Sequence, residues 1–280
     1  MLSPEHGRAV LRSLNVSDED LMLRLLPLAR LYSAAAISGF GVGAIAKAWM
    51  PVKSNEFALF LGANIEFPAQ ALTQTIHAEQ CAVVNAWLQG AGRVETIAVT
   101  AAPCGYCRQF LYELDGGQNL KILIDRKPGE KATPQTLSEF LPQAFGPRQL
   151  GQSTGLMARP AQPDGLRLQP SSNDPLVKQA WSAANQSYAP YSRNCAGIAV
   201  QTGKGSVFTG RYVENAAFNP SLSPLHTALV QMNMDRLDGH HPITRAVLVE
   251  RPTAISQRPV CELLLQTVAP DVNLEYYEAK

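Results

Sequence analysis

The sequence carries almost no net charge, and this limits the partners that we expect. It has 24 basic and 23 acidic residues in 280, which gives a formal net charge of +1 at pH 7. Proteins that bind nucleic acids or membrane surfaces concentrate basic residues on the face that meets the phosphates. We therefore expect neither a nucleic acid nor a membrane as partner.

The sequence also lacks the features of exported and membrane-spanning chains. No apolar run approaches the roughly 20 residues needed to cross a bilayer. The first ten residues, MLSPEHGRAV, do not combine a basic region with an apolar one. Five cysteines are an odd number in a chain long enough to fold without crosslinks, which argues against a disulfide framework. We expect a cytoplasmic protein with reduced thiols, available to bind a metal.

What the sequence does contain fits a globular protein in two parts. It is 46% hydrophobic and 17% charged, and a chain of this length forms one large or two ordinary domains with substantial cores. From its sequence patterns, we expect a helical segment at 1–30, a first domain at 31–150, a linker at 151–172 and a second domain at 173–280.

Residues 18–32 are predicted to form an amphipathic helix. Ser17 is a suitable N-cap, and three acidic residues at 18–20 follow it in the first turn, where the helix dipole favours negative charge. Pro27 would kink this helix. The apolar positions that recur at helical spacing are Leu21, Leu25, Leu28 and Tyr32.

Several later runs are typical of strands or of buried helices. The apolar residues that follow His77 predict a buried helix ending near Gly90. Strands that alternate with helical segments predict an α/β sandwich with a mixed sheet. The runs predicted as strands are 39–48, 57–67, 96–102 and 120–124.

The pattern of the first half recurs in the second half. VFTGRYVENAA aligns with LFLGANIEFPA at a spacing of 148 positions, AGIAV near 196 echoes VGAIA near 42, and AVLVERP echoes IAVTAAP. Between the halves, the stretch 146–174 is dense in Gly, Pro, Ser and Gln and is predicted to be a linker or a long surface connection. Three correspondences in the same order indicate an internal duplication, so we expect two copies of one fold. The residues matched at the spacing of 148 are Phe60, Gly62 and Glu66 with Phe208, Gly210 and Glu214.

A C-x-x-C pair and a distant histidine offer ligands for one metal ion. Cys104 and Cys107 begin a predicted helix, where residues three apart share a face and unpaired N–H groups favour thiolates. If a helix also begins at His77, two helix N-termini can converge on one point. One imidazole and two thiolates would bind Zn²⁺ and leave a fourth tetrahedral position for water. Glu79 is placed to take a proton from that water and to pass it to a substrate nitrogen or leaving group.

Each of these residues also has a less specific interpretation. His77 could be a hydrogen-bonded core histidine beside a surface Glu79. The C-x-x-C pair could be a redox pair or half of a structural zinc site. Cys81, four residues after His77, could close the coordination shell as a fourth ligand, although a buried cysteine in a helix is commonly a small hydrophobe.

Taken together, these motifs resemble the zinc-dependent cytidine and deoxycytidylate deaminases. H-A-E at 77–79 followed by P-C-x-x-C at 103–107 is the signature of that family. GANIEF, HAEQCA, PCGYCRQF, LPQAFGP and NQSYAPYS resemble the large, two-domain, homodimeric class of cytidine deaminases, and the similarity extends from about residue 20 to the C-terminus. The resemblance implies a duplicated three-layer α/β/α sandwich. It also implies hydrolysis of cytidine and 2′-deoxycytidine to uridine, 2′-deoxyuridine and ammonia in pyrimidine salvage.

The resemblance assigns the metal and the proton shuttle to named residues. The family residues that match His77, Cys104 and Cys107 bind one Zn²⁺ per chain, and the one that matches Glu79 shuttles protons. One catalytic site per chain would then lie in the first copy, and the substrate would be a small nucleoside.

The resemblance also implies a substrate pocket that is completed across a homodimer. Asn64 and Glu66 match the pair that hydrogen-bonds the ribose, and their spacing of two on a strand places both side chains on one face. The less specific interpretation is a turn-forming asparagine and a solvated glutamate. Phe40 matches an aromatic residue that packs on the base, and Phe145 matches one supplied by the partner subunit, although such residues are often only part of a core.

The second copy departs from this pattern. With AVLVERP aligned to IAVTAAP, Thr253 and Ser256 stand where the first copy has its two cysteines, so we expect no zinc there. His226 falls close to the position of the metal-binding histidine, with Thr227 or Ala228 near that of the glutamate, and we interpret His226 as structural.

Two other functions stay open at this point. One is a deaminase that acts on a cytosine nucleotide or on single-stranded nucleic acid, and the other is a non-catalytic scaffold stabilised by zinc. The near-neutral charge and the lack of a basic aromatic groove argue against nucleic acid, and the open coordination position argues against a scaffold. The segment between Phe40 and Asn64 is longer than we expect for the family, so the lip of the pocket around 47–58 is not predicted.

Overall fold

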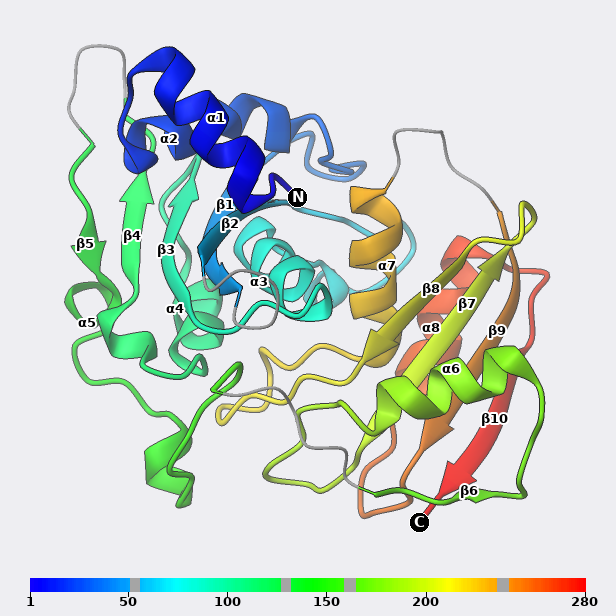
Figure 1. Ribbon diagram of the computed structural model, residues 1–280. Coiled ribbons are helices and arrows are strands. Elements are labelled where there is room, and N and C mark those ends of the chain that lie inside the picture. The colour runs from blue at the N-terminus through cyan, green and yellow to red at the C-terminus, as the bar shows by residue number, and fades with distance from the viewer. Residues whose placement is uncertain (51–55, 127–131, 159–164, 236–241) are drawn as a thin grey trace. The chain divides into compact units, whose positions relative to one another are not determined.

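The chain folds into two compact units, each with its own mixed sheet (Figure 1). Unit 1 comprises Met1–Glu66 and Thr73–Pro160, and unit 2 comprises Phe67–Leu72 and Ala161–Lys280. Among the described helices, none is long and apolar enough to cross a membrane. The computed structural model describes residues 1–50, 56–126, 132–158, 165–235 and 242–280, so part of the segment at 47–58 lies outside the described residues.

Unit 1 is built on five strands: β1 Gly43–Met50, β2 Glu56–Ala63, β3 Val94–Val99, β4 Lys121–Ile124 and β5 Gln135–Thr136. Their order in the sheet is β2-β1-β3-β4-β5. β3 and β4 run parallel, and the other neighbours run antiparallel. The four strands predicted for this half are confirmed, and the sheet is mixed as expected.

Helices cover both faces of this sheet. A Cβ at Gly43 would lie 2.7 Å from Arg30 N, and a Cβ at Gly62 would lie 2.2 Å from Ala82 N, so the sheet meets a helix backbone closely on each face. Gly62 of β2 pairs with Ala44 of β1, the neighbour of Gly43, so Gly43 and Gly62 face opposite sides of the sheet. Helices therefore pack on both sides, which makes a three-layer sandwich. The helices are α1 Pro4–Leu14, α2 Asp18–Arg30, α3 Ala78–Leu88, α4 Gly105–Tyr112 and α5 Leu137–Phe140, with short 3₁₀ turns η1 Leu72–Gln74, η2 Gly117–Asn119 and η3 Pro147–Leu150.

The predicted helix near the N-terminus is confirmed, and its buried face agrees with the predicted one only in part, at Leu21 and the partly buried Leu25. Asp20 N donates to Ser17 Oγ at 3.1 Å, as an N-cap requires, and the helix continues past Pro27 to Arg30. Leu28 is 46% exposed. Nearly every position from 21 to 28 is apolar, so periodicity alone does not fix which stripe faces the sheet. The residues that α2 buries are Leu21, Met22, Leu26 and Ala29.

Unit 2 repeats this architecture with β6 Leu168–Gln169, β7 Ala196–Thr202, β8 Val207–Arg211, β9 Ile243–Glu250 and β10 Leu274–Ala279. The order is β6-β10-β9-β7-β8, again with one parallel pair, β9 and β10. Its helices are α6 Pro175–Ala184, α7 Pro224–Met234 and α8 Arg258–Val268. Figure 1 shows α6 and α8 on opposite faces of this sheet.

Details of packing show that the two units are copies of one fold. A Cβ at Gly197 would lie 2.1 Å from Ala184 N, and a Cβ at Gly210 would lie 2.0 Å from Pro224 O, so these glycines repeat the close approaches seen in unit 1. The register irregularity of β1 and β3 at 47/48 recurs in β7 and β9 at 201/202, which lies 154 positions later. The predicted duplication is confirmed.

The two copies differ in the origin of their fifth strand. In unit 1, β5 follows β4 along the chain, whereas in unit 2, β6 precedes all the other elements and pairs antiparallel with β10. β6 and η3 both lie in the stretch 146–174 that was predicted to be a linker or a long surface connection. Backbone pairing with β10 recruits the two residues of β6 from a Gly- and Pro-rich segment that has no strand pattern of its own.

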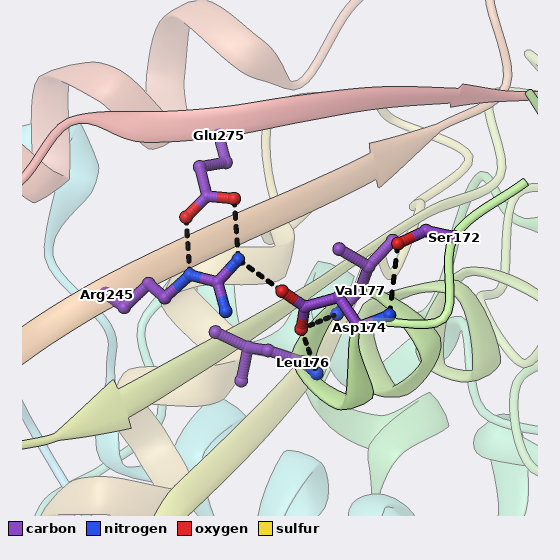
Figure 2. A network of polar contacts seen from close by, with 6 residues as sticks. All are labelled: Ser172, Asp174, Leu176, Val177, Arg245 and Glu275. Carbon is purple, nitrogen blue, oxygen red and sulfur yellow. Dashed lines mark hydrogen bonds and ion pairs between the residues drawn. The ribbon is translucent and has the colours of Figure 1, made fainter. Parts of the chain in front are cut away.

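A polar network joins three elements of unit 2 (Figure 2). Arg245 of β9 binds Glu275 of β10 through Nε and Nη2, at 2.5 and 2.8 Å, and binds Asp174 at 2.7 Å. Asp174 is the N-cap of α6, where its Oδ1 accepts from the backbone N–H groups of Leu176 and Val177. The network therefore ties the start of α6 to the parallel strand pair.

Candidate functional site

Two helix N-termini converge in unit 1, as the sequence predicts. His77 is the N-cap of α3, and Cys104 is the N-cap of α4. Ile76, directly before His77, pairs with Ile65 through two backbone hydrogen bonds of 2.9 and 3.0 Å. This pairing holds the start of α3 beside the chain that leaves β2.

His77, Cys104 and Cys107 form the one group of metal-ligating side chains found among the described residues. His77 Nδ1 lies 3.3 Å from Cys107 Sγ and 3.6 Å from Cys104 Sγ, and the two sulfurs are 3.7 Å apart. Zn–S bonds of about 2.3 Å and Zn–N bonds of about 2.0–2.1 Å imply tetrahedron edges of about 3.8 Å between sulfurs and about 3.5 Å between sulfur and nitrogen. The three ligand atoms therefore already have the spacing of three corners of a zinc tetrahedron.

The electrostatics of the two thiols favour metal binding. Hydrogen bonding from Cys107 lowers the pKa of Cys104 to about 5, although partial burial opposes the shift. The pKa of Cys107 is raised, first by that same interaction and then by burial. Because a thiolate is the form that ligates a metal, one ligand is ready at neutral pH, and a cation would release the remaining proton.

Glu79 follows His77 in the first turn of α3 and is 4% exposed. Burial raises the pKa of its carboxyl, while hydrogen bonds from its own backbone N–H and from Cys107 lower it by less. A carboxyl that is buried beside the ligand group and titrates above its usual range suits proton transfer near neutral pH. The alternative of a surface glutamate is excluded.

Cys81 does not join the ligand group among the residues that the structure describes. It is fully buried in α3, and burial raises its pKa to about 12. It therefore behaves as a small core residue, which was the less specific of its two interpretations.

Three neighbours of the ligands were not singled out from the sequence. Tyr106 stacks on the His77 ring, with centroids 5.5 Å apart and planes 29° apart. Gln80 Oε1 accepts from His77 N at 3.0 Å. Arg108 donates from Nε to Pro103 O at 2.8 Å and so fixes the backbone before Cys104. Tyr106 lies between the two cysteines of the C-x-x-C motif, and this position in the sequence could have marked it as a neighbour of the ligands.

Asn64 and Glu66 hold the segment 33–42, which we name the Phe40 loop. Asn64 Oδ1 accepts from Ser33 Oγ at 2.7 Å and from Val42 N at 2.8 Å, and its Nδ2 donates to Phe40 O at 3.0 Å. The structure therefore brings both predicted ribose-binding residues to the loop that carries the predicted base-packing residue.

The carboxylate of Glu66 makes the contacts on the other side of this loop. Its Oε2 accepts from Ile37 N at 2.7 Å and from Ser38 N at 2.9 Å, and its Oε1 accepts from Ser38 Oγ at 2.5 Å. Burial raises the pKa of Glu66, but these donors lower it further, so the pKa is below its ordinary value. Glu66 is an anion at neutral pH.

Both predicted aromatic residues are exposed rather than part of a core. Phe40 is 60% exposed and Phe145 is 45% exposed. The carbonyl of Phe145 accepts from Gln109 Nε2 of α4 at 2.8 Å, which fixes the backbone while the ring faces outward. The interpretation of these two residues as ordinary core is excluded.

The corresponding place in unit 2 has different residues from those predicted. α7 is N-capped by Ser223, so Ser223, not His226, takes the position of His77. His226 instead matches Gln80: its Nδ1 lies 3.2 Å from Ser223 N, as Gln80 Oε1 does from His77 N at 3.0 Å. Counting from the N-cap, Leu225 stands at the place of Glu79, which corrects the placement at Thr227 or Ala228.

In unit 2, a buried carboxylate takes the place of the sulfur ligands that unit 1 has. Glu250, 1% exposed, accepts from Asn194 Nδ2 at 2.7 Å, from Gln257 N at 2.8 Å and from Ser256 Oγ at 3.0 Å. Gln257 is the N-cap of α8, and Thr253 lies exposed in the loop before it. By the same count from the N-cap, Gln257 stands at the place of Cys104 and Val260 at that of Cys107, which corrects the placement at Thr253 and Ser256. His226 has a structural contact, as expected.

Comparison with known proteins finds cytidine and deoxycytidylate deaminases. Residues 16–120 and 137–262 each match a family model described as the cytidine and deoxycytidylate deaminase zinc-binding region. Among solved structures, the cytidine deaminase of Mycobacterium tuberculosis is 29% identical over 47% of this chain and 99% of its own, with a TM-score of 0.39.

Curated relatives match over nearly the whole chain. The cytidine deaminase of Aliivibrio fischeri is 41% identical over 99% of this chain and 88% of the relative. That of Serratia proteamaculans is 46% identical over 91% of this chain and 81% of the relative, and that of Yersinia pestis is 43% identical over 92% and 82%. With two matched zinc-binding regions and relatives of this similarity, the chain belongs to the cytidine and deoxycytidylate deaminase family.

Proposed function

We propose that this protein hydrolyses cytidine and 2′-deoxycytidine to uridine and 2′-deoxyuridine with release of ammonia. The observation that carries the proposal is the convergence of three zinc ligands with tetrahedral spacing beside the buried carboxyl of Glu79. The relatives named above carry the name cytidine deaminase, and the site has the parts which that reaction requires.

The zinc ion would be held by His77, Cys104 and Cys107, with one ion per chain. Bound zinc supplies a nucleophile at neutral pH, because coordination lowers the pKa of water from about 15.7 to about 7. The N-cap positions of His77 and Cys104 present their side chains at the positive ends of two helices, which stabilises the thiolate charge.

Glu79 would move the protons. Its carboxyl takes a proton from the attacking water and delivers it to N3 of the pyrimidine, and a second transfer reaches the exocyclic amine as the C4–N4 bond breaks. Oxygen from water becomes the C4 carbonyl, and ammonia leaves. The raised pKa of Glu79 suits a group that must both accept and donate a proton near neutral pH.

Asn64, Glu66 and Phe40 would bind the nucleoside. The Glu66 carboxylate has about four acceptor positions and gives three of them to the Phe40 loop, which leaves about one for a ribose hydroxyl. The Asn64 amide gives one of its two hydrogens to Phe40 O. Phe40 would pack on the pyrimidine ring, and its exposure in the chain leaves that face available.

A homodimer in which the partner subunit supplies Phe145 is part of this proposal. An exposed aromatic ring on a fixed backbone suits insertion into a neighbouring site. Mixing Glu79→Gln with Phe145→Ala subunits tests it, because a mixed dimer would contain one complete site and regain turnover. We also place the protein in the cytoplasm and in pyrimidine salvage, and the five free cysteines accord with a reducing compartment.

The central experiment compares wild type with Glu79→Gln. Ultraviolet absorbance would follow cytidine, 2′-deoxycytidine, CMP and cytosine, and zinc content would be measured in both proteins. We expect nucleoside turnover by the wild type, a loss of about 10²- to 10⁴-fold in the variant, and equal zinc content.

The other outcomes are informative as well. Turnover of CMP without turnover of cytidine would replace the proposal with a nucleotide deaminase. Zinc without turnover of any of the four compounds would leave a non-catalytic scaffold. Undiminished turnover by Glu79→Gln would contradict the role of Glu79.

A further inference from the structure

Unit 2 contains a counterpart of the Phe40 loop at 187–196, which lies 154 positions later. Glu214 occupies the place of Glu66 and accepts through Oε2 from Tyr191 N at 2.8 Å and from Ser192 N at 3.1 Å. These are the same two backbone donors that reach Glu66 in unit 1. The carboxylate contact is therefore a property of the fold, present also where two cysteine ligands are absent.

The two loops also share the turn at their tip. Phe40 N donates to Ser38 Oγ at 3.0 Å, and Asn194 N donates to Ser192 Oγ at 3.1 Å. The residue between each pair is left-handed, with φ of +65° in unit 1 and +60° in unit 2. A serine thus receives the backbone N–H of the residue two positions later in both copies.

The copies differ in the residue that comes directly after the turn. Asn194 is fully buried and donates to Glu250, so its own side chain anchors the loop of unit 2. Phe40 is 60% exposed, and its apolar ring can make no hydrogen bond of that kind to a carboxylate. In unit 1, the Ser38 hydroxyl donates to Glu66 Oε1 while it accepts from Phe40 N, so it links the fixed carboxylate to the backbone of the exposed aromatic residue.

We propose that Ser38 is a positioning residue that sets the affinity for the pyrimidine nucleoside by fixing Phe40. The inference rests on the proposed function, because it takes Phe40 as the residue that packs on the base. Ser38 acts through Phe40 and does not itself touch the reacting atoms.

The physical basis is preorganisation of the loop. A hydrogen bond to a carboxylate is stronger than one between neutral groups, and here it fixes the serine hydroxyl that accepts from the backbone N–H of an exposed aromatic residue. Without it, Phe40 keeps the contact of its carbonyl with Asn64 but loses the contact of its N–H, so its ring samples more conformations and nucleoside binding must order it again. The proposed zinc ligands and Glu79 lie at the starts of α3 and α4, so the chemical step is unaffected once the substrate is bound.

The experiment compares Ser38→Ala with the matched control Ser192→Ala, which removes the equivalent turn contact in unit 2. Cytidine turnover would give kcat and KM, and competitive inhibition by uridine would report binding without chemistry. We expect Ser38→Ala to raise both KM and the uridine inhibition constant by about 5- to 20-fold, with kcat within about 2-fold of wild type. Ser38→Thr, which keeps the hydroxyl, should restore both constants.

Zinc content and the thermal midpoint would be measured for each variant and should agree between Ser38→Ala and Ser192→Ala. The inference is overturned if Ser38→Ala leaves both constants unchanged, if Ser192→Ala raises them equally, or if Ser38→Thr fails to restore them. A fall in kcat at unchanged KM would also overturn it. An inactive wild type would contradict the proposed function itself. A failure of the Ser38 inference can therefore be told apart from a failure of the proposed function.

Discussion

Unit 1 and unit 2 use the same scaffold and fill its centre differently. In both, a sheet with the same order and the same irregularity carries two helices whose N-termini approach each other. In unit 1 the N-caps are His77 and Cys104. In unit 2 they are Ser223 and Gln257.

In each unit, a negatively charged side chain lies at a helix N-terminus, which is the positive end of the helix dipole. In unit 1 the charge comes from the Cys104 thiolate, whose pKa is lowered to about 5. In unit 2 it comes from the buried carboxylate of Glu250, which accepts from the N–H of the α8 N-cap. The convergence of helix ends is therefore a property of the fold, and a few side chains decide whether it binds a cation.

The largest difference between the units is expected from Cys107→Ser. This variant removes a sulfur corner of the zinc site, so zinc should fall from about one ion per chain to a small fraction and turnover should fall by about 10³-fold or more. The matched control is Cys261→Ser, because Cys261 is equally buried in the first turns of α8. Metal analysis that found zinc unchanged by Cys107→Ser, or lost in Cys261→Ser, would break the distinction between the units.

The shared scaffold is tested next by Gly62→Ala and Gly210→Ala. Each added Cβ would lie within about 2.2 Å of helix backbone atoms. The strand must therefore move away from its helix, and we expect each change to lower the free energy of unfolding by about 1–3 kcal/mol. Gly7→Ala, whose Cβ would meet only Leu2 Cδ2 at 4.0 Å, is the control. Urea midpoints would measure the stability of all three variants. An unchanged midpoint for Gly62→Ala or Gly210→Ala would contradict the conclusion that both units pack a strand glycine against a helix in the same way.

A smaller effect is expected at the Tyr106 ring, which stacks on the N-cap residue of α3 in unit 1, whereas the N-cap of α7 in unit 2 is a serine without a ring. Stacking restricts the rotation of the His77 ring, so Tyr106→Ala should weaken zinc binding by about 3- to 10-fold in competition with a chelator. Tyr106→Phe keeps the stacked ring and should stay within about 2-fold of wild type. Equal affinities for Tyr106→Ala and wild type would show that the stacking does not contribute.

The smallest effect is expected at the network of Figure 2 in unit 2. In unit 1, Lys47 of β1 similarly binds Asp18 at the start of α2 and Glu95 of β3, at 2.6 and 3.5 Å. Arg245 lowers the pKa of Asp174, so the carboxylate stabilises the fold above its unfolded pKa of about 3.8, and this contribution is lost as the pH falls through the lower folded pKa. The side chains are about one third exposed, which limits the effect of Arg245→Ala at pH 7 to about 1 kcal/mol or less. The difference between wild type and variant in urea midpoint should narrow as the pH falls from 7 towards 3, and a constant difference would contradict this origin.

Much of the site was predictable because its signals are local. The spacing of Cys104 and Cys107, the position of Glu79 and the helix start at His77 all lie within single elements, whose geometry fixes which side chains meet. The contacts of Asn64 and Glu66 with the Phe40 loop were not predictable, since they join segments more than 20 residues apart whose approach depends on the sheet register.

The errors arose where loop lengths differ between the copies. The spacing of equivalent residues is 154 at Gly43 and Gly197, 148 at Gly62 and Gly210, and 146 at the helix N-caps His77 and Ser223. The spacing found in the strands therefore aligns His226 with His77, whereas the helix N-caps align Ser223 with His77 and His226 with Gln80. The buried face of α2 was predicted only in part for a different reason, because an almost continuous apolar run contains several equivalent stripes.

The fifth strand comes last along the chain in unit 1, as β5, and first in unit 2, as β6. This difference decides where the polypeptide can be divided. A fragment that begins at residue 173 would lose β6 and leave one side of β10 without its backbone partner. Unpaired strand edges promote self-association, so such a fragment would tend to aggregate. A fragment that begins at residue 165 would retain the protecting strand.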